Sequence, residues 1–193
     1  MALKILALGL MAIFYLCYFS KMLKQKKQGI HMDQLGKDKE CFLKFIEIAL
    51  KTATYLLPAL QIISIVFAPG NNSGALLVAG IVIELLGVVA FVASVREMKD
   101  NWRAGVQRKD KTNLVTTGIY AISRNPAFLG FILMYIGILC AFFNWCLLVA
   151  TVLAVGLFHL QIVKVEEPFL IETFGQEYLA YQKKVCRYLG NKL

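Results

Sequence analysis

The sequence predicts an all-α, polytopic integral membrane protein that forms one domain. Its 193 residues are 59% hydrophobic, and the mean hydropathy of +0.64 lies far above that of a soluble domain of this size. Five hydrophobic runs alternate with charged or turn-forming segments. Each run is long enough, at about 1.5 Å per helical residue, to approach the thickness of the hydrocarbon layer. We therefore expect about five transmembrane helices.

The order of the runs suggests how these helices are connected. Asn144 alone separates the fourth run, which is the shortest, from the fifth. These two runs are expected to form a tight C-terminal helical hairpin that either crosses the bilayer twice or re-enters from one side. Residues 1–68 are expected to form an N-terminal helical hairpin, and residues 69–193 the half that carries the polar motifs. The five expected helices are Ala2–Phe19, Phe42–Ala68, Gly74–Val95, Ala127–Phe143 and Trp145–Val163.

Basic residues gather in alternate connections between these runs. Only Lys4 and Lys51, of the 21 lysines and arginines, fall outside the segments that share one side of the membrane. By the positive-inside rule, the N-terminus is expected outside, and the C-terminus and the basic loops in the cytoplasm. The same clusters explain the net charge of +9 through contact with anionic membrane lipids. No basic groove studded with aromatic residues is present, so we expect no role in binding nucleic acid.

Polar side chains inside the predicted helices need partners. Glu84 lies near the middle of the third run, where an ionised carboxylate costs several kcal/mol unless it is paired or reached by water. We expect Glu84 to be protonated or hydrogen-bonded and to join two helices; the alternative is a carboxylate that lines a substrate cavity. Gln61 and His159 admit the same two interpretations. His31 and His159 are too far apart to suggest a metal site, and none is expected.

Two pairs of glycines occur seven residues apart, one pair in the third run and one in the fourth. Such spacing places both small residues of a pair on one helix face, which lets two helix backbones approach closely. We therefore expect tight helix packing, and no chemistry, at Gly80, Gly87, Gly130 and Gly137.

A polar, turn-forming segment at residues 112–130 lies between the third and fourth runs. Gly118 permits a turn, and Pro126 both directs Asn125 away from helical geometry and starts the next helix. The free backbone amides at such a helix start can bind an anionic group. Arg124 beside them offers a planar fork for a carboxylate.

Acidic residues at the end of the fifth run complete this candidate site. His159, Val163 and either Glu166 or Glu167 share one helix face near the cytoplasmic interface. If the hairpin folds as expected, Arg124 and the glutamate pair meet at one membrane depth. The alternative is a plain salt bridge at the interface.

These segments together resemble the isoprenylcysteine carboxyl methyltransferase family and its phospholipid methyltransferase relatives. The resemblance covers about residues 101–188, and it rests on residues 114–120, 124–130, 166–167 and 174–181 together with Val185 and Arg187. The chain departs from the family where Asn125 replaces a histidine, Phe128 a tyrosine and Cys186 a proline. Asparagine can donate and accept hydrogen bonds as histidine does, but it cannot supply an imidazole proton.

The resemblance implies a methyltransferase that uses S-adenosylmethionine, releases S-adenosylhomocysteine and methylates the carboxylate of a lipophilic, prenylcysteine-like small molecule or prenylated substrate. One alternative is a lipid amine N-methyltransferase, which would need a base such as Glu84 or His159 at the substrate. Another is a non-enzymatic membrane carrier or scaffold. The sequence has no Gly-x-Gly-x-x-Gly motif after a strand, so the cofactor pocket must be built from helices and the polar loop on the cytoplasmic side.

The resemblance also implies roles for individual residues. Arg124 would hold the carboxylate of the acceptor or of the cofactor, and Glu167 the cationic end of the cofactor. Asn125 and Tyr120 would orient the cofactor, so that Arg124, Asn125 and Glu167 form the catalytic set. By position, the cofactor contacts fall on Gln107, Thr112, Asn113, Leu114, Val115, Tyr120, Asn125, Pro126, Ala127, Phe128 and Glu167.

The segment after Glu167 is predicted to form an amphipathic helix at the cytoplasmic interface. Apolar and aromatic residues recur there at steps of three and four, up to Tyr188. We expect the tyrosine rings at the level of the lipid headgroups and a bend at Gly175. This helix either anchors the chain to the membrane or roofs the cofactor pocket.

Overall fold

The structure is a computed structural model that describes residues 1–27, 41–67, 74–99 and 113–191. Within these ranges the chain is helical, and its one pairing of extended residues is an isolated bridge between Val185 and Asn191. The elements, in chain order, are α1 (Ala2–Lys27), α2 (Cys41–Phe67), α3 (Gly74–Met98), η2 (Gly118–Ala121), α4 (Pro126–Ala141), α5 (Trp145–Gln161), η3 (Ile162–Glu166), α6 (Glu167–Phe174) and α7 (Gln176–Lys184).

Four helices are long and apolar enough to cross a membrane in the described part of the chain. They are α1, α2, α3 and the continuous helix Trp145–Phe174, which joins α5, η3 and α6. α4 is apolar but shorter, with 16 residues. The predicted class, an all-α polytopic membrane protein, is confirmed. α1 runs beyond the predicted end at Phe19 to Lys27, because lysine is a good helix former whose charged end reaches water.

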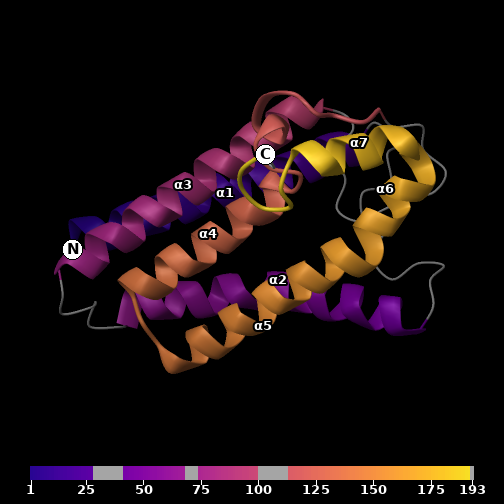
Figure 1. Cartoon of the computed structure of the whole chain (residues 1–193). Coiled ribbons are helices and arrows are strands. Elements are labelled where there is room, and N and C mark those ends of the chain that lie inside the picture. The colour runs from indigo at the N-terminus through magenta and orange to yellow at the C-terminus, as the bar shows by residue number, and fades with distance from the viewer. Residues whose placement is uncertain (28–40, 68–73, 100–112, 192–193) are drawn as a thin grey trace.

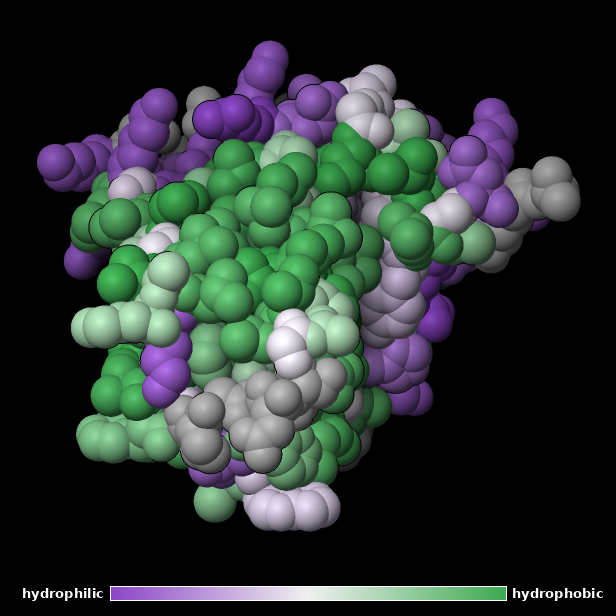
Figure 2. Space-filling model, turned by 90° about the vertical axis from the view of Figure 1, so that its left-hand side faces the viewer, coloured by the Kyte–Doolittle hydropathy of each residue, from purple (hydrophilic) through white to green (hydrophobic). Residues whose placement is uncertain are grey.

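The outer surface of the helix bundle is apolar, as expected for a surface that lipid covers. Figure 2 shows a broad hydrophobic face with hydrophilic side chains gathered at its margins. Large apolar side chains on several helices are more than half exposed, as at Phe45, Leu86 and Val152. A continuous face of this kind is stable when lipid covers it.

Helix α4 lies between the α1–α3 pair and the α2–α5 pair (Figure 1). Aromatic side chains from these helices meet in the core. The rings of Phe14 in α1 and Phe91 in α3 stack at 4.3 Å, and Phe131 in α4 lies edge-on at 4.7 Å from Phe14. Phe158 in α5 extends the cluster, with its ring 5.5 Å from that of Phe131.

The closest helix contact joins α3 to α4 through the predicted glycines. A Cβ added to Gly80 would lie 2.6 Å from the carbonyl oxygen of Gly137, and one added to Gly87 would lie 2.7 Å from that of Gly130. Neither distance leaves room for a side chain, so the predicted tight packing is confirmed. α4 is thereby held in a fixed position against α3, and the polar loop that precedes α4 is held with it.

In the part of the chain that the structure describes, Gln61 lacks the predicted hydrogen bond, and of the two forms predicted for Glu84 the hydrogen-bonded one is not found. Both side chains are fully buried, and neither carboxyl oxygen of Glu84 nor either amide atom of Gln61 has a hydrogen-bond partner there. The backbone of Glu84 contacts α4 at Gly137, whose added Cβ would lie 2.5 Å from the Glu84 backbone nitrogen. An ionised carboxyl that is buried without a hydrogen-bond partner is costly, so the neutral form of the Glu84 carboxyl is favoured.

The C-terminal helical hairpin forms at the predicted place. The side chain of Asn144 accepts hydrogen bonds from the backbone N–H groups of Cys146, at 2.8 Å, and Leu147, at 3.4 Å. These bonds cap the N-terminus of α5, whose first amides have no partner within the helix. The cap fixes the sharp reversal between α4 and α5.

Candidate functional site

The polar loop after α3 is fixed at Gly118. This residue has a φ of +57°, and a Cβ there would lie 2.6 Å from the carboxyl carbon of Glu97. The hydroxyl of the neighbouring Thr117 donates to Oε1 of Glu97 at 2.6 Å. The positive φ at this position favours glycine, and the missing Cβ leaves room for the Glu97 carboxyl group.

Tyr120 anchors the same loop to two other elements. Its buried hydroxyl lies 2.7 Å from Oγ of Ser94 in α3. Its carbonyl oxygen accepts a 2.6 Å hydrogen bond from the hydroxyl of Tyr181 in α7. Tyr120 thus joins α3 to α7 through the loop.

Asn125 and Pro126 start α4 as the sequence predicts. Asn125 has a non-helical φ of −134°, and Pro126 occupies the first turn of the helix. The amide group of Asn125 turns away from the helix start and donates from Nδ2 to the carbonyl oxygen of Arg187 at 3.0 Å. Asn125 therefore contacts the C-terminal segment instead of capping its own helix.

A π turn, η3, lies between α5 and α6. Its defining bond runs from the N–H of Glu167 to the carbonyl oxygen of Ile162. Pro168 follows directly and has no N–H to continue the α-helical pattern. In an unbroken α-helix Glu166 would share the face of His159, but the wider π turn shifts the register by one residue. Glu167 is consequently the glutamate that faces the site.

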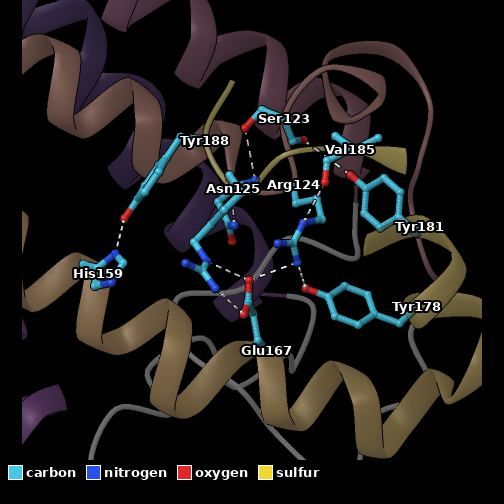
Figure 3. A network of polar contacts seen from close by, with 10 residues as sticks. Ser123, Arg124, Asn125, His159, Glu167, Tyr178, Tyr181, Val185 and Tyr188 are labelled. Atoms are coloured by element: carbon cyan, nitrogen blue, oxygen red, sulfur yellow. Dashed lines mark hydrogen bonds and ion pairs between the residues drawn. The ribbon is translucent and has the colours of Figure 1, made fainter. Parts of the chain in front are cut away.

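The Glu167 carboxylate lies between two arginines (Figure 3). Its Oε1 is 2.9 Å from Nη1 of Arg124 and 2.9 Å from Nε of Arg187, and its Oε2 accepts from Nη2 of Arg187 at 2.9 Å. The side chains of Arg124 and Glu167 are 3% and 9% exposed, whereas that of Arg187 is 33% exposed. The predicted meeting of Arg124 with the glutamates at the end of the fifth run is confirmed for Glu167. We call these three residues the arginine–glutamate cluster.

Tyr178 of α7 holds the cluster through Arg124, and Tyr181 of the same helix bonds the loop beside it. The hydroxyl of Tyr178 accepts a 2.9 Å bond from Nη1 of Arg124, and Nε of Arg124 donates to the carbonyl oxygen of Val185 at 3.1 Å. Burial raises the pKa of Tyr178 above its ordinary value, although the charge of Arg124 acts in the other direction. Tyr178 and Tyr181 are 1% and 7% exposed, so both rings pack inside the protein and not against lipid. Each hydroxyl has a partner inside the protein, which makes burial of the ring favourable.

The segment after α7 folds back over the loop. The predicted bend at Gly175 is present as a break between α6 and α7, with a φ of 52°. The helix ends at Lys184, not at the predicted Tyr188. The next residues pair with the loop through bonds from Arg124 N to Cys186 O, at 3.1 Å, and from Gly190 N to Ile122 O, at 2.8 Å.

The profile of the phospholipid methyltransferase family matches residues 75–177, more than half of the chain. The chain belongs to the phospholipid methyltransferase family. The matched segment runs from α3 to the start of α7 and contains Arg124, Asn125 and Glu167. Arg187 lies beyond it.

Curated relatives confirm the resemblance to isoprenylcysteine carboxyl methyltransferases. The protein-S-isoprenylcysteine O-methyltransferase of Saccharomyces cerevisiae is 40% identical over 72 residues, which are 37% of this chain and 30% of that protein. The Xenopus laevis enzyme is 34% identical over 110 residues, 56% of this chain and 38% of the relative. Enzyme B of Arabidopsis thaliana is 28% identical over 131 residues, 64% of each. The chain spans less than two thirds of the length of these relatives.

The remaining predicted cofactor positions lie in the segment before η2, in the first turn of α4, or outside the described residues. Leu114 packs against Tyr178, Tyr181 and Val185, and Asn113 and Val115 flank it in the same segment before η2. Pro126, Ala127 and Phe128 form the first turn of α4. Gln107 and Thr112 lie outside the described residues. The described residues contain no group of three or more metal-ligating side chains.

The two predicted substrate residues occupy different places. His159 contacts the C-terminal segment through its Nδ1, which lies 2.9 Å from the hydroxyl of Tyr188. Glu84 lies opposite Gly137, which is eleven residues past Pro126, about 16 Å along the axis of α4. The structure therefore brings His159, but not Glu84, toward the end of the bundle that carries the cluster.

Arg187 is the functional candidate that sequence reasoning missed. The sequence pattern Val185-Cys186-Arg187 was part of the resemblance, but no role followed from it. Hydrogen bonds with Glu167 raise the pKa of the Arg187 guanidinium above its ordinary value, against the opposing effect of burial. Arg187 is therefore a permanent cation at the exposed side of the cluster.

Proposed function

We propose that this chain is an integral membrane methyltransferase that transfers a methyl group from S-adenosylmethionine to the carboxylate of a lipophilic, prenylcysteine-like acceptor. The family supports the reaction class, and the names of the relatives support the acceptor. The observation that carries the proposal is the arginine–glutamate cluster, a charged site at the end of apolar helices. Buried charges of this kind are costly, and beside membrane-spanning helices they are a default hypothesis for a functional site.

The residues of the cluster fit the amino-acid end of the cofactor. Glu167 accepts bonds from Arg124 and Arg187, but a carboxylate has room for a further donor, such as an ammonium group. Two guanidinium charges and one carboxylate charge leave one net positive charge. A site with one acceptor and an excess of donors suits a zwitterion that carries both an ammonium and a carboxylate group.

The protein's part in the reaction is positioning and electrostatics. When bound, S-adenosylmethionine supplies an electrophilic methyl group on a sulfonium centre. An acceptor carboxylate is already anionic and needs no general base, so alignment of the two ligands is the main requirement. The cluster, held by Tyr178 and Asn125, would supply fixed charges for that alignment.

The same charge balance favours a carboxylate acceptor over an amine. A net positive site attracts an anionic acceptor, whereas an amine must lose a proton before it attacks. Of the two bases considered for that reaction, Glu84 lies about 16 Å along α4 from the helix start at Pro126. His159 lies at the end of the bundle that carries the cluster, where its Nδ1 is 2.9 Å from the hydroxyl of Tyr188. We accordingly keep the carboxylate as the proposed methyl acceptor.

Orientation and partners complete the proposal. The N-terminus faces out, and the cluster and the C-terminus face the cytoplasm, where the soluble cofactor enters; the lipophilic acceptor enters from the membrane. Membrane lipids contact the apolar helices and the basic loops. The catalytic half is residues 69–193.

Radiolabelled methyl transfer tests the proposal. The purified protein is incubated with methyl-labelled S-adenosylmethionine and the free acid of an S-farnesylcysteine derivative. The methyl ester of the same derivative and phosphatidylethanolamine serve as alternative acceptors. We expect label in a base-labile ester of the free acid only. Label in phosphatidylethanolamine would favour the amine reaction, and no label in any acceptor would contradict the proposal.

A further inference from the structure

The two arginines of the cluster differ in exposure and in how many of their N–H donors have an acceptor. The Arg124 side chain is 3% exposed, and it bonds Glu167, Tyr178 and the carbonyl oxygen of Val185. Arg187 is 33% exposed, and its guanidinium bonds only Glu167 among the residues that the structure describes. A guanidinium has more N–H donors than these two bonds use. Arg187 therefore presents unused donors at the open side of the cluster.

Two contacts fix the position of the planar Arg187 guanidinium, which forms a fork of N–H donors. Glu167 accepts from both Nε and Nη2, each at 2.9 Å, so the plane of the guanidinium cannot rotate freely. Asn125 donates to the backbone carbonyl oxygen of Arg187 at 3.0 Å, which ties the residue to the start of α4. A held, planar fork loses little entropy when it binds a second anion.

We infer that Arg187 binds the carboxylate of the ligand, while the buried Arg124 is a positioning residue that fixes Glu167. The inference rests on the proposed function and gives a role to a residue outside the matched family segment, residues 75–177. Carboxylates occur in two ligands of the reaction, the amino-acid part of the cofactor and the lipophilic acceptor. Arg187 binds one of these two groups through donors that Glu167 leaves unused.

The charge of the cluster supports an anion at this place. With Glu167 shared between two cations, one positive charge is uncompensated within the cluster. A bound carboxylate neutralises this charge and completes the bonding of the Arg187 fork. A neutral or cationic group at Arg187 would leave this positive charge of the cluster uncompensated.

The first test compares Arg187→Gln with Lys183→Gln. Lys183 is an exposed cation four residues earlier in the chain, so both variants lose one positive charge near the same surface. Calorimetry measures the binding of S-adenosylhomocysteine and of its decarboxylated analogue, 5′-(3-aminopropylthio)-5′-deoxyadenosine. If Arg187 holds the cofactor carboxylate, Arg187→Gln weakens S-adenosylhomocysteine binding by roughly tenfold or more. The analogue, which lacks the carboxylate, binds wild type and variant alike.

The second test addresses the acceptor. The free acid and the methyl ester of an S-farnesylcysteine derivative are compared as competitive ligands in wild type and in Arg187→Gln. If Arg187 holds the acceptor carboxylate, the variant loses affinity for the acid, again by roughly tenfold, and keeps its affinity for the ester. Cofactor binding then stays unchanged.

The outcomes separate a ligand contact from a structural role. Selective loss for the carboxylate form of either ligand, absent in Lys183→Gln, supports the inference. Equal loss for both forms of both ligands means that Arg187 only holds Glu167, and it overturns the inference, as does unchanged binding of all four ligands. A wild-type protein that binds no S-adenosylhomocysteine and transfers no methyl group overturns the proposed function itself.

Discussion

Glu167 Oε1 lies 2.9 Å from Nη1 of Arg124, although the two residues lie near the starts of two different helices. Arg124 directly precedes the start of α4, and Glu167 begins α6 after the π turn. The bond therefore joins the two halves of the C-terminal hairpin at their polar end. Removing Glu167 would leave the buried Arg124 without its counterion, which is the costly way to break such a pair. Removing Arg124 would leave Glu167 paired with Arg187.

Glu167→Gln tests the carboxylate in this pair. The amide keeps the shape of the side chain and can still accept a hydrogen bond, so the fold is expected to persist with a lower melting temperature. Loss of the negative charge is expected to weaken S-adenosylhomocysteine binding by roughly tenfold or more, because bonds that involve a charged group contribute about 1.5–3 kcal/mol. Isothermal titration measures this change. An unchanged dissociation constant in a monodisperse variant would show that Glu167 does not meet the cofactor.

Tyr178→Phe tests the support behind Arg124. The variant loses a buried hydroxyl that accepts from a guanidinium, so we expect a loss of about 1.5–3 kcal/mol in unfolding free energy. Tyr55→Phe is the control, because Tyr55 is 51% exposed on α2. Thermal unfolding in detergent compares the two variants. Equal melting temperatures would mean that the Tyr178 hydroxyl does not stabilise the cluster.

Gly137→Ala tests the contact between α3 and α4. The added methyl would lie 2.6 Å from the carbonyl oxygen of Gly80, and overpacking of this kind costs about 1–3 kcal/mol. Gly156→Ala on α5 is the matched control, since nothing lies within 4 Å of its added Cβ. That change is expected to be neutral or stabilising. A Gly137→Ala protein as stable as the control would contradict the close packing.

Cysteine labelling tests the orientation in the membrane. In a cysteine-free background, Asn144→Cys is expected to react with a membrane-impermeant thiol reagent from outside, and Lys183→Cys only from the cytoplasm. Asn144 is at the turn between α4 and α5, and Lys183 is exposed in the last turn of α7. Labelling of position 144 from the cytoplasmic side would support a re-entrant or inverted hairpin.

Local sequence signals predict much of this structure. Hydrophobic runs, the Asn125-Pro126 start of α4 and the glycine pairs each act through neighbouring residues or one helix face, and each was found as predicted. Arg124 and the glutamate pair were also expected to meet.

The remaining features depend on contacts that sequence periodicity does not contain. The π turn changes the register by one residue and selects Glu167 over Glu166. Tyr178 and Tyr181 face inward because the loop offers partners for their hydroxyls. Arg187 joins the cluster only because the chain reverses after α7 and pairs with residues 122–124.

Thermal unfolding of the detergent-solubilised wild-type protein with S-adenosylhomocysteine tests the central claim most directly. A ligand that binds only the folded protein stabilises it by about 2.7 kcal/mol at a hundred times its dissociation constant. We predict a rise in melting temperature that grows with S-adenosylhomocysteine concentration and is absent with adenosine at the same concentration. A melting temperature that stays constant up to millimolar S-adenosylhomocysteine would contradict the claim that this chain binds the methyltransferase cofactor.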